Sequence, residues 1–265
     1  MPRHVVAITG ASAGIGRATA IRLARDGAAV AICARRADRL AGVADEVRGA
    51  GGDALPIVAD VAREADIDQF VTATVDHFKR LDVMLCNAGF GIAGAIDDIA
   101  PDQMRKLIDV NFTGTYLAAR AALRVFRRQG YGHVMVVSSI VGKRGVPYMG
   151  AYAATKFAQV GLAECLRSEV AGSNIRVTVV YPVSTDTEFF DVMSHETGVA
   201  VTRGGGPRQS VEVVADAIAH AIDRPTAEVY PYFKARFLVV LNAIAPGVTD
   251  LIVQRFGRKP VRIKS

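Results

Sequence analysis

Apolar residues occur along the whole chain in short β-branched runs, which alternate with longer stretches of helical periodicity. A short apolar run between turn residues predicts a buried strand, and apolar residues spaced three and four apart predict a helix. The predicted strands are Val5–Thr9, Ala29–Ala34, Leu55–Ala59, Val83–Cys86, His133–Ser138, Arg176–Tyr181 and Glu228–Tyr230. The predicted helices are one that ends before Gly27 and, after it, Arg39–Ala50, Glu64–Lys79, Pro101–Arg128, Ala151–Ala171 and Val211–Asp223.

Strands that alternate with helices predict the α/β class, with a parallel sheet whose two faces are covered. We therefore expect a Rossmann-type doubly wound parallel sheet of about seven strands with helices on both faces. Ligands of such sheets bind at the carboxyl ends of the strands. Five polar or turn residues follow strands directly in this way: Gly10, Asp60, Asn87, Ser139 and Pro182.

The chain is expected to form one domain over residues 1–265. With 265 residues, of which 51% are apolar and 22% charged, it can bury a large core. Residues from about 183 to 209 are expected to form an irregular substrate loop that closes over the site. Residues from about 235 to 265 form a segment that is first apolar and then basic.

The turn after the first strand is rich in glycine and leads directly into a helix. Its residues are Gly10, Ser12, Gly14, Ile15 and Gly16, in the pattern GxxxGxG. Without side chains, this backbone can approach a pyrophosphate at the helix N-terminus. The turn therefore predicts a dinucleotide-binding site.

Tyr152 and Lys156 lie four residues apart in a predicted helix, so the phenol and the ammonium share one face. A tyrosine with a pKa of about 10 is a poor base at neutral pH, and a nearby cation lowers that pKa. Ser139, at the end of a predicted strand, could hold a substrate oxygen beside them.

Together these motifs resemble the short-chain dehydrogenase/reductase family over nearly the whole chain. The sequence TGASAGIG matches its phosphate-binding turn, Asp60 and Val61 match the pair that meets the adenine, and Asn87-Ala88-Gly89 matches its NAG motif. Its catalytic tetrad corresponds to Asn111, Ser139, Tyr152 and Lys156.

The resemblance implies a role for each residue of the tetrad. Tyr152 would exchange a proton with the substrate oxygen, which Ser139 also binds. Lys156 would lower the pKa of the phenol and hold the nicotinamide ribose. Asn111, in a helix, would keep a water next to Lys156.

The loop after the sixth strand departs from the family pattern. Thr187 stands where a threonine is usual, but Val183 replaces a glycine and Thr185 replaces a branched apolar residue. A valine disfavours a positive φ, so this loop over the nicotinamide is expected to run differently. Thr185 and Thr187 remain candidate cofactor contacts.

The end of the second strand predicts the choice of cofactor. An acidic residue there binds the ribose of NAD, whereas an arginine accommodates the 2′-phosphate of NADP. Here Ala34 takes the acidic position, and Arg35 and Arg36 follow it. NADP(H) is therefore the expected cofactor, and NAD(H) is possible if the arginines only solvate a loop.

Mostly apolar residues surround the tetrad and follow Pro182, which favours a lipophilic ketone or secondary alcohol as substrate. They are Phe90, Ile92, Ile140, Val146, Tyr148, Met149, Phe189, Phe190, Val192 and Met193. Several of them could equally belong to the core. The expected activity is that of an alcohol dehydrogenase or carbonyl reductase. The alternative is a catalytically silent protein that senses dinucleotides or binds partners, but such a protein has no reason to keep all four tetrad groups.

The net charge of +6 raises the question of other partners. Five basic residues lie between Arg255 and Lys264, and we expect a solvated terminus there, with peripheral membrane contact as the alternative. No nucleic-acid partner is expected. The spacing of the three cysteines suggests neither a metal site nor a disulfide framework, and a cytoplasmic location is expected. Family likeness implies a homodimer or homotetramer that pairs through the helices at 101–128 and 151–171.

Overall fold

The computed structural model describes residues 3–201, 206–255 and 261–262, and its centre is a seven-stranded parallel sheet. The strand order is β10-β6-β5-β4-β1-β2-β3. The strands are β1 (Val5–Thr9), β2 (Ala29–Ala34), β3 (Asp53–Val58), β4 (Val83–Cys86), β5 (Tyr131–Val137), β6 (Asn174–Val180) and β10 (Glu228–Val229). The predicted fold class is confirmed, although β3, β5 and β6 each begin two residues before their predicted starts.

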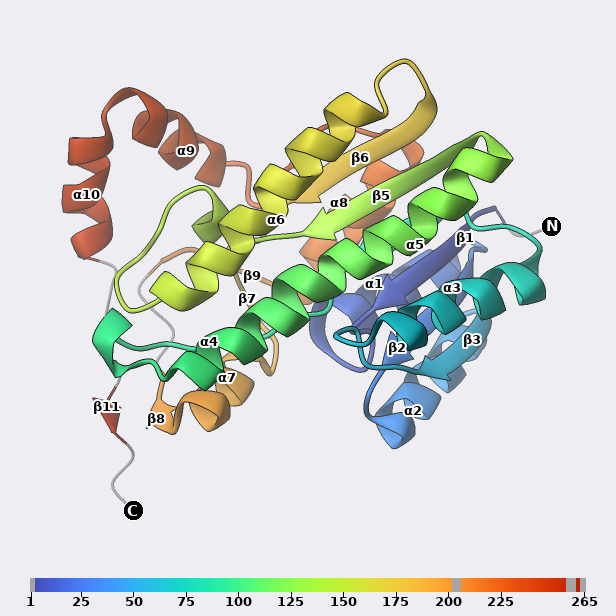
Figure 1. The fold of residues 1–265 in the computed structure, drawn as a ribbon, viewed down its shortest axis with the longest axis horizontal. Coiled ribbons are helices and arrows are strands. Elements are labelled where there is room, and N and C mark those ends of the chain that lie inside the picture. Colours follow the sequence, from blue (N-terminus) through green and yellow to red (C-terminus); the bar gives the residue numbers. More distant parts are fainter. Residues whose placement is uncertain (1–2, 202–205, 256–260, 263–265) are drawn as a thin grey trace.

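Helices cover both faces of the sheet (Figure 1). One layer consists of α1 (Gly14–Arg25), α2 (Ala37–Gly49) and α8 (Val211–Asp223), and the other of α3 (Glu64–Phe78), α5 (Gly114–Gln129) and α6 (Gly150–Glu169). Each layer has its own apolar cluster against the sheet. Every residue of β1 and β2 is buried, which explains why these strands are continuously apolar or small.

The predicted helix Pro101–Arg128 is interrupted by a π-helical turn. It consists of α4 (Pro101–Leu107), the π turn at Ile108–Thr113, and α5. Asn111 therefore lies in a helix, as expected, but in a π-helical turn of it and not in a regular α-helical one. A π turn interrupts the regular backbone hydrogen bonds of a helix and is often found at functional sites.

The predicted substrate loop is more ordered than its composition suggested. It contains β7 (Ser184–Thr185), the nine-residue helix α7 (Phe189–Thr197), β8 (Val199–Ala200) and β9 (Arg208–Gln209), which pairs with β7. Residues 202–205 of this segment lie outside the described residues. The expectation of an irregular segment was therefore wrong over α7.

The C-terminal segment folds into α9 (Ala235–Ile244) and α10 (Pro246–Gln254), and β11 (Val261–Arg262) pairs with β8. The two helices lie beyond the carboxyl ends of the central strands, apart from both helix layers (Figure 1). Within the described ranges, none of the helices is long and apolar enough to cross a membrane. Most of the tail from Arg255 to Lys264, where we expected a solvated terminus, lies outside the described residues.

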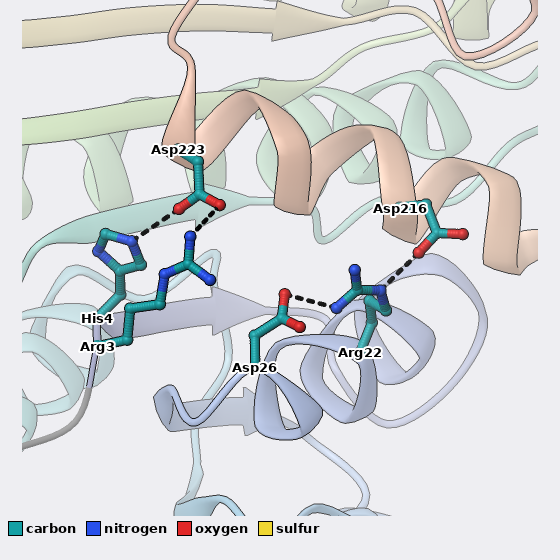
Figure 2. Close-up of polar contacts among 6 residues, drawn as sticks. All are labelled: Arg3, His4, Arg22, Asp26, Asp216 and Asp223. Carbon is teal, nitrogen blue, oxygen red and sulfur yellow. Dashed lines mark hydrogen bonds and ion pairs between the residues drawn. The ribbon is translucent and has the colours of Figure 1, made fainter.

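Ion pairs connect α8 to the beginning of the chain and to α1 (Figure 2). Asp223, at the end of α8, pairs with Arg3 and with His4, whose Nε2 lies 3.1 Å from the carboxylate. Arg22 of α1 contacts both Asp26 and Asp216 at 2.5 Å. Because these groups are partly exposed, each pair contributes about 1 kcal/mol or less to stability. The two helices also contribute buried apolar residues to the same cluster.

Candidate active site

A single cavity of about 830 Å³ lies at the carboxyl ends of the strands and extends from the glycine turn to the C-terminal helices. It brings together most of the predicted site residues. Those that line it are Gly10, Ser12, Gly14, Ile15, Arg35, Arg36, Asp60, Val61, Asn87, Ala88, Gly89, Ser139, Tyr152, Lys156, Thr185 and Thr187. Gly16 and Asn111 are buried behind its wall.

The glycine turn has a shape that side chains would not permit. Gly10 and Gly14 have φ of +67° and +54°, and a Cβ on Gly10 would come within 2.6 Å of the Ala88 Cα. Asn87 Nδ2 donates to the Thr9 and Gly10 carbonyls at 2.9 and 3.2 Å, which holds the turn against the end of β4. A Cβ on Gly16 would clash with that same amide at 2.6 Å.

The N-terminus of α1 opens into the cavity without a side-chain cap. Its N-cap residue, Ala13, has no side-chain oxygen, and the first turn of the helix contains no acidic residue. The amide groups of this turn are therefore suited to an anion. The residues present fit the pyrophosphate of a dinucleotide.

At the other side of the turn, Arg36 is held by a carboxylate that the sequence did not indicate. Arg36 Nη2 lies 3.0 Å from Ser12 Oγ and 2.8 Å from Glu188 Oε1, and Arg39 Nη1 lies 2.6 Å from Glu188 Oε2. The hydrogen bond from Arg36 is the main reason that the pKa of Glu188 is lowered. Arg35 is exposed beside them. Glu188, the N-cap residue of α7, thus joins α7 to the start of α2 across the mouth of the cavity.

Tyr152 projects from α6 into the cavity and is almost completely buried. Burial raises the pKa of its phenol above the ordinary value, and a hydrogen bond with the Ser139 hydroxyl offsets part of that rise. The ring packs against Phe189 of α7, with 5.3 Å between the centroids. Ser139 Oγ also accepts from the Val141 amide at 3.3 Å, which orients the hydroxyl at the end of β5.

Lys156 lies one helical turn further along, also buried. Its Nζ donates to the Val137 carbonyl at 2.9 Å and to Gln159 Oε1 at 3.1 Å, and lies 5.6 Å from the centre of the Tyr152 ring. Burial lowers the pKa of Lys156 to about 7. The sequence predicted that this cation would lower the pKa of the phenol, but burial is the larger effect on both groups.

Gln159 connects Lys156 to the π turn, and sequence reasoning missed it. Its side chain is fully buried, and its Nε2 donates to the Asn111 carbonyl at 2.6 Å and to Thr115 Oγ1 at 2.8 Å. Asn111 Oδ1 accepts from the Phe90 amide at 3.0 Å, and Asn111 Nδ2 donates to the Phe90 carbonyl at 2.9 Å. A glutamine amide therefore lies between Lys156 and the Asn111 carbonyl.

The apolar part of the cavity contains most of the residues proposed to contact substrate. Phe90, Ile140, Val146, Tyr148, Met149, Phe189, Phe190 and Val192 line it. Ile92 and Met193 do not line it and are fully buried in the core. Tyr148 has φ of +62°, a left-handed conformation that is unusual for a tyrosine and found in residues held by their surroundings.

Sequence reasoning also missed the wall that the C-terminal segment provides. Tyr232, Leu238, Ile252 and Val253 line the cavity from before α9 through α10. A signal was available, because apolar residues recur at helical spacing in this segment. That spacing alone does not tell which face turns inward.

The loop after β6 accommodates its unusual residues without strain. Among the described non-glycine residues only Lys79 and Tyr148 have positive φ, so Val183 does not need the conformation that a valine disfavours. Thr185 Oγ1 donates to the Val183 carbonyl at 2.9 Å and accepts from Gln209 Nε2 at 3.1 Å. Thr187 Oγ1 accepts from the Phe189 amide at 3.2 Å, at the start of α7.

Comparisons with known proteins agree with this geometry. The family model described as short chain dehydrogenase matches residues 4–197. The uncharacterized oxidoreductase YxnA of Bacillus subtilis is 31% identical over 258 residues, which are 95% of this chain and 72% of that protein. Two solved structures superimpose on much of this chain. The alcohol dehydrogenase from the archaeon Thermococcus sibiricus, complexed with 5-hydroxy-NADP, has a TM-score of 0.76 and 30% identity and covers 86% of this chain and 95% of its own. The 3-ketoacyl-(acyl-carrier-protein) reductase from Brucella melitensis, complexed with NADH, has a TM-score of 0.77 and 27% identity. It covers 86% of this chain and 96% of its own.

The family model spans most of the chain and includes the glycine turn, the π turn around Asn111, and the helix that bears Tyr152 and Lys156. The chain belongs to the short-chain dehydrogenase family and is an oxidoreductase of that family.

Proposed function

We propose that the protein uses NADP(H) to transfer hydride between nicotinamide and a lipophilic ketone or secondary alcohol. The observation that carries the proposal is the continuity of one cavity. The same hollow contains the glycine turn, the buried pair of Tyr152 and Lys156 with Ser139, and an apolar end. A dinucleotide and an apolar substrate could therefore meet at the phenol.

The residues of the chain fit a nicotinamide dinucleotide. The amides after Ala13 would bind the pyrophosphate, Asp60 and Val61 would lie beside the adenine, and Lys156 would hold the nicotinamide ribose. Structural neighbours bound to 5-hydroxy-NADP and to NADH support this class of cofactor without deciding between its members. A preference for NADP(H) is inferred from Arg35 and Arg36, and from Ala34 at the usually acidic position.

The bound cofactor would supply the hydride, and the chain's own residues would control the substrate oxygen. Ser139 donates a hydrogen bond to that oxygen and orients the carbonyl. Tyr152 Oη gives its proton to the same oxygen in reduction, or removes it in oxidation. The pKa of this phenol is raised by burial, so at neutral pH it is protonated, the form that donates a proton to a carbonyl oxygen.

Lys156 supports Tyr152 through its charge. With a pKa of about 7, it exchanges between ammonium and amine near neutral pH. The ammonium form favours the phenolate that remains after Tyr152 has given up its proton. The proposal therefore needs Lys156 to be protonated during turnover, which makes its hydrogen-bond partners important.

The proton donor is tested by Tyr152→Phe, which keeps the ring and its packing on Phe189 but removes the exchangeable proton. We expect turnover of a hydrophobic ketone to fall by at least about a hundredfold, the usual scale of acid–base catalysis, while NADPH binding persists. A panel of hydrophobic ketones, followed through NADPH absorbance, provides the substrate for this comparison. A variant with near-normal activity would contradict the assignment of Tyr152.

Cofactor preference is tested by steady-state kinetics with NADPH and NADH on the same ketone. The wild type should prefer NADPH by at least about tenfold, the value of one charge-assisted bond to phosphate. The double change Ala34→Asp with Arg35→Ala adds a carboxylate that repels the phosphate and removes one of its partners. Preference should then move toward NADH, mainly through KM, because the 2′ group is remote from the hydride. A wild type that already prefers NADH would refute the NADP assignment.

A further inference from the structure

The outer face of the C-terminal helices is an exposed apolar stripe. Phe233, Phe237, Val240 and Ile244 follow one another at intervals of four, three and four residues, so they lie on one side of α9 and the turn before it. The exposed fraction is 66% for Phe237 and 78% for Ile244. Large apolar residues that are exposed next to one another indicate an interaction surface for a protein, a membrane or another apolar ligand.

The next helix, α10, also carries exposed apolar residues, Val248 and Leu251, which are 51% and 65% exposed. Both helices lie beyond the carboxyl ends of the strands, apart from the two helix layers that cover the sheet (Figure 1). We call these six residues, from Phe233 to Leu251, the outer stripe.

The charges beside the outer stripe are basic. The sequence from 229 to 249 contains no aspartate or glutamate, whereas Lys234 and Arg236 are exposed within it and Arg255 is exposed at the end of α10. The nearby carboxylate of Asp250 pairs with Arg144. An apolar face flanked by cations matches the requirements of a surface of anionic phospholipid.

We propose that the outer stripe binds the surface of an anionic phospholipid membrane, with α9 and α10 lying in the interface. Phe233 and Phe237 would enter the boundary between headgroups and acyl chains. Arg236 and Arg255 would face the negative headgroups, and Lys234, which also lines the cavity, would reach them from its rim.

A second copy of the chain fits this surface less well than a membrane does. In a symmetric dimer, the outer stripe of one copy would lie against the outer stripe of the other, because a two-fold interface uses the same surface of both copies. The basic residues of one copy would then lie near those of the other, with no acidic residue in the 229–249 segment to pair with them. Asp250, the carboxylate within the stripe segment, is already paired with Arg144, whereas anionic lipid supplies negative charges that are free to pair.

Other residues of the same helices form part of the cavity wall. Leu238 of α9 and Ile252 and Val253 of α10 line the cavity. A protein bound through the outer stripe would hold the apolar end of its cavity close to the bilayer. A lipophilic substrate dissolved in the membrane could then enter without crossing bulk water, a consequence that rests on the proposed function.

Membrane binding itself is tested without any enzymatic assay. The full chain is sedimented with vesicles of phosphatidylcholine alone and with vesicles that also contain phosphatidylserine. We expect binding to the anionic vesicles that weakens with added salt, and at least about tenfold weaker binding to phosphatidylcholine alone, since each basic residue near the surface contributes about fivefold. Equal failure to bind both kinds of vesicle at low salt would overturn the proposal.

The stripe is tested by Phe237→Glu, with Val213→Glu as the matched control. Val213 is an exposed apolar residue on α8, 46% exposed, so the control has the same change in charge on a different surface. We expect Phe237→Glu to weaken vesicle binding by at least about tenfold, because it removes a phenylalanine side chain that would be buried in the membrane. Val213→Glu should bind much as the wild type does. Unfolding temperatures of both variants establish that they are folded. If Phe237→Glu unfolds, Ile244→Asp on the same stripe replaces it.

Two further measurements separate the possible outcomes. Light scattering of the wild type and of Phe237→Glu shows whether the stripe joins two copies; if the change lowers the mass and leaves vesicle binding intact, the membrane proposal is wrong. Reduction of a water-soluble ketone should be unchanged in Phe237→Glu, whereas reduction of a ketone confined to vesicles should fall by at least about tenfold. If no ketone is reduced by the wild type, the proposed function fails while the vesicle-binding result still decides the membrane proposal.

Discussion

Replacement of Gln159 by leucine should change the pH dependence of the reaction, although Gln159 touches neither cavity nor substrate. Lys156 Nζ has two hydrogen-bond acceptors, the Val137 carbonyl at 2.9 Å and Gln159 Oε1 at 3.1 Å. Leucine has nearly the volume of glutamine but cannot accept a hydrogen bond. The ammonium form of Lys156 would therefore lose one acceptor while it stays buried.

The size of the effect follows from the strength of that bond. A hydrogen bond to a charged group is worth about 1.5–3 kcal/mol, and about 1.4 kcal/mol corresponds to one pH unit. The pKa of Lys156, which burial already lowers to about 7, should therefore fall further in the variant, by roughly one to two pH units. At pH 7 the protonated fraction would decrease from about half to a tenth or less, and kcat would decrease by about the same factor.

The assay is the pH profile of kcat for ketone reduction, measured for the wild type and for two changes at the same position. Gln159→Leu should move the limb that reports Lys156 to lower pH. Gln159→Glu should move it to higher pH, because a carboxylate beside the ammonium favours the charged form. Opposite movements at one position are difficult to produce by a general loss of packing.

Thr74→Val serves as the control for lost structure. Thr74 is buried on α3, and its Oγ1 donates to the Phe70 carbonyl at 2.7 Å, so the control loses one buried hydrogen bond among residues outside the cavity. It should lower the free energy of unfolding by about 1 kcal/mol and leave the pH profile unchanged. If Gln159→Leu also loses stability and keeps the wild-type profile, Gln159 is a structural residue and the reasoning about Lys156 is refuted.

Two other predictions follow from ion pairs and buried groups. Glu188→Gln removes the carboxylate that pairs with Arg36 and Arg39, which leaves these arginines available to the 2′-phosphate. Because partly exposed ion pairs are worth about 1 kcal/mol at most, NADPH should bind up to about fivefold more tightly, and the affinity for NADH should change little. Fluorescence titration with both cofactors measures this, and equal changes in the two affinities would contradict it. Burial, and secondarily Arg176 and His4, lower the pKa of His133 to about 4. In the unfolded chain His133 is protonated below about pH 6.5, whereas in the folded chain it is protonated only below about pH 4. The contribution of neutral His133 to the free energy of unfolding is therefore complete above about pH 6.5. Between these two values it decreases with acidification by up to about 1.4 kcal/mol per pH unit. Urea unfolding of His133→Gln across this range should show a shallower decrease than the wild type, and parallel curves would show that other groups cause the acid sensitivity.

The sequence by itself determined the features that depend on neighbouring residues. Alternating apolar runs and helical stretches predicted the parallel sheet, because burial on both faces requires continuously apolar strands. The glycines at 10 and 14 predicted a turn that the backbone makes with positive φ. The spacing of four between Tyr152 and Lys156 placed both on one face of α6, since that spacing is a property of the helix alone.

Tertiary structure decided how those groups behave, because their environment comes from distant parts of the chain. The sequence predicted a phenol activated by a cation, but the pKa of Tyr152 depends first on how completely the fold removes it from water. Lys156 and Gln159 are three residues apart on α6, but only the tertiary structure brings the Asn111 carbonyl within 2.6 Å of the Gln159 amide, across 48 residues of sequence. Glu188 reaches Arg36 across 152 residues, and α9 and α10 supply residues to the cavity wall while other apolar residues of the same helices stay exposed. Such contacts depend on which segments the sheet and its helices bring together, and local spacing carries no information about that choice.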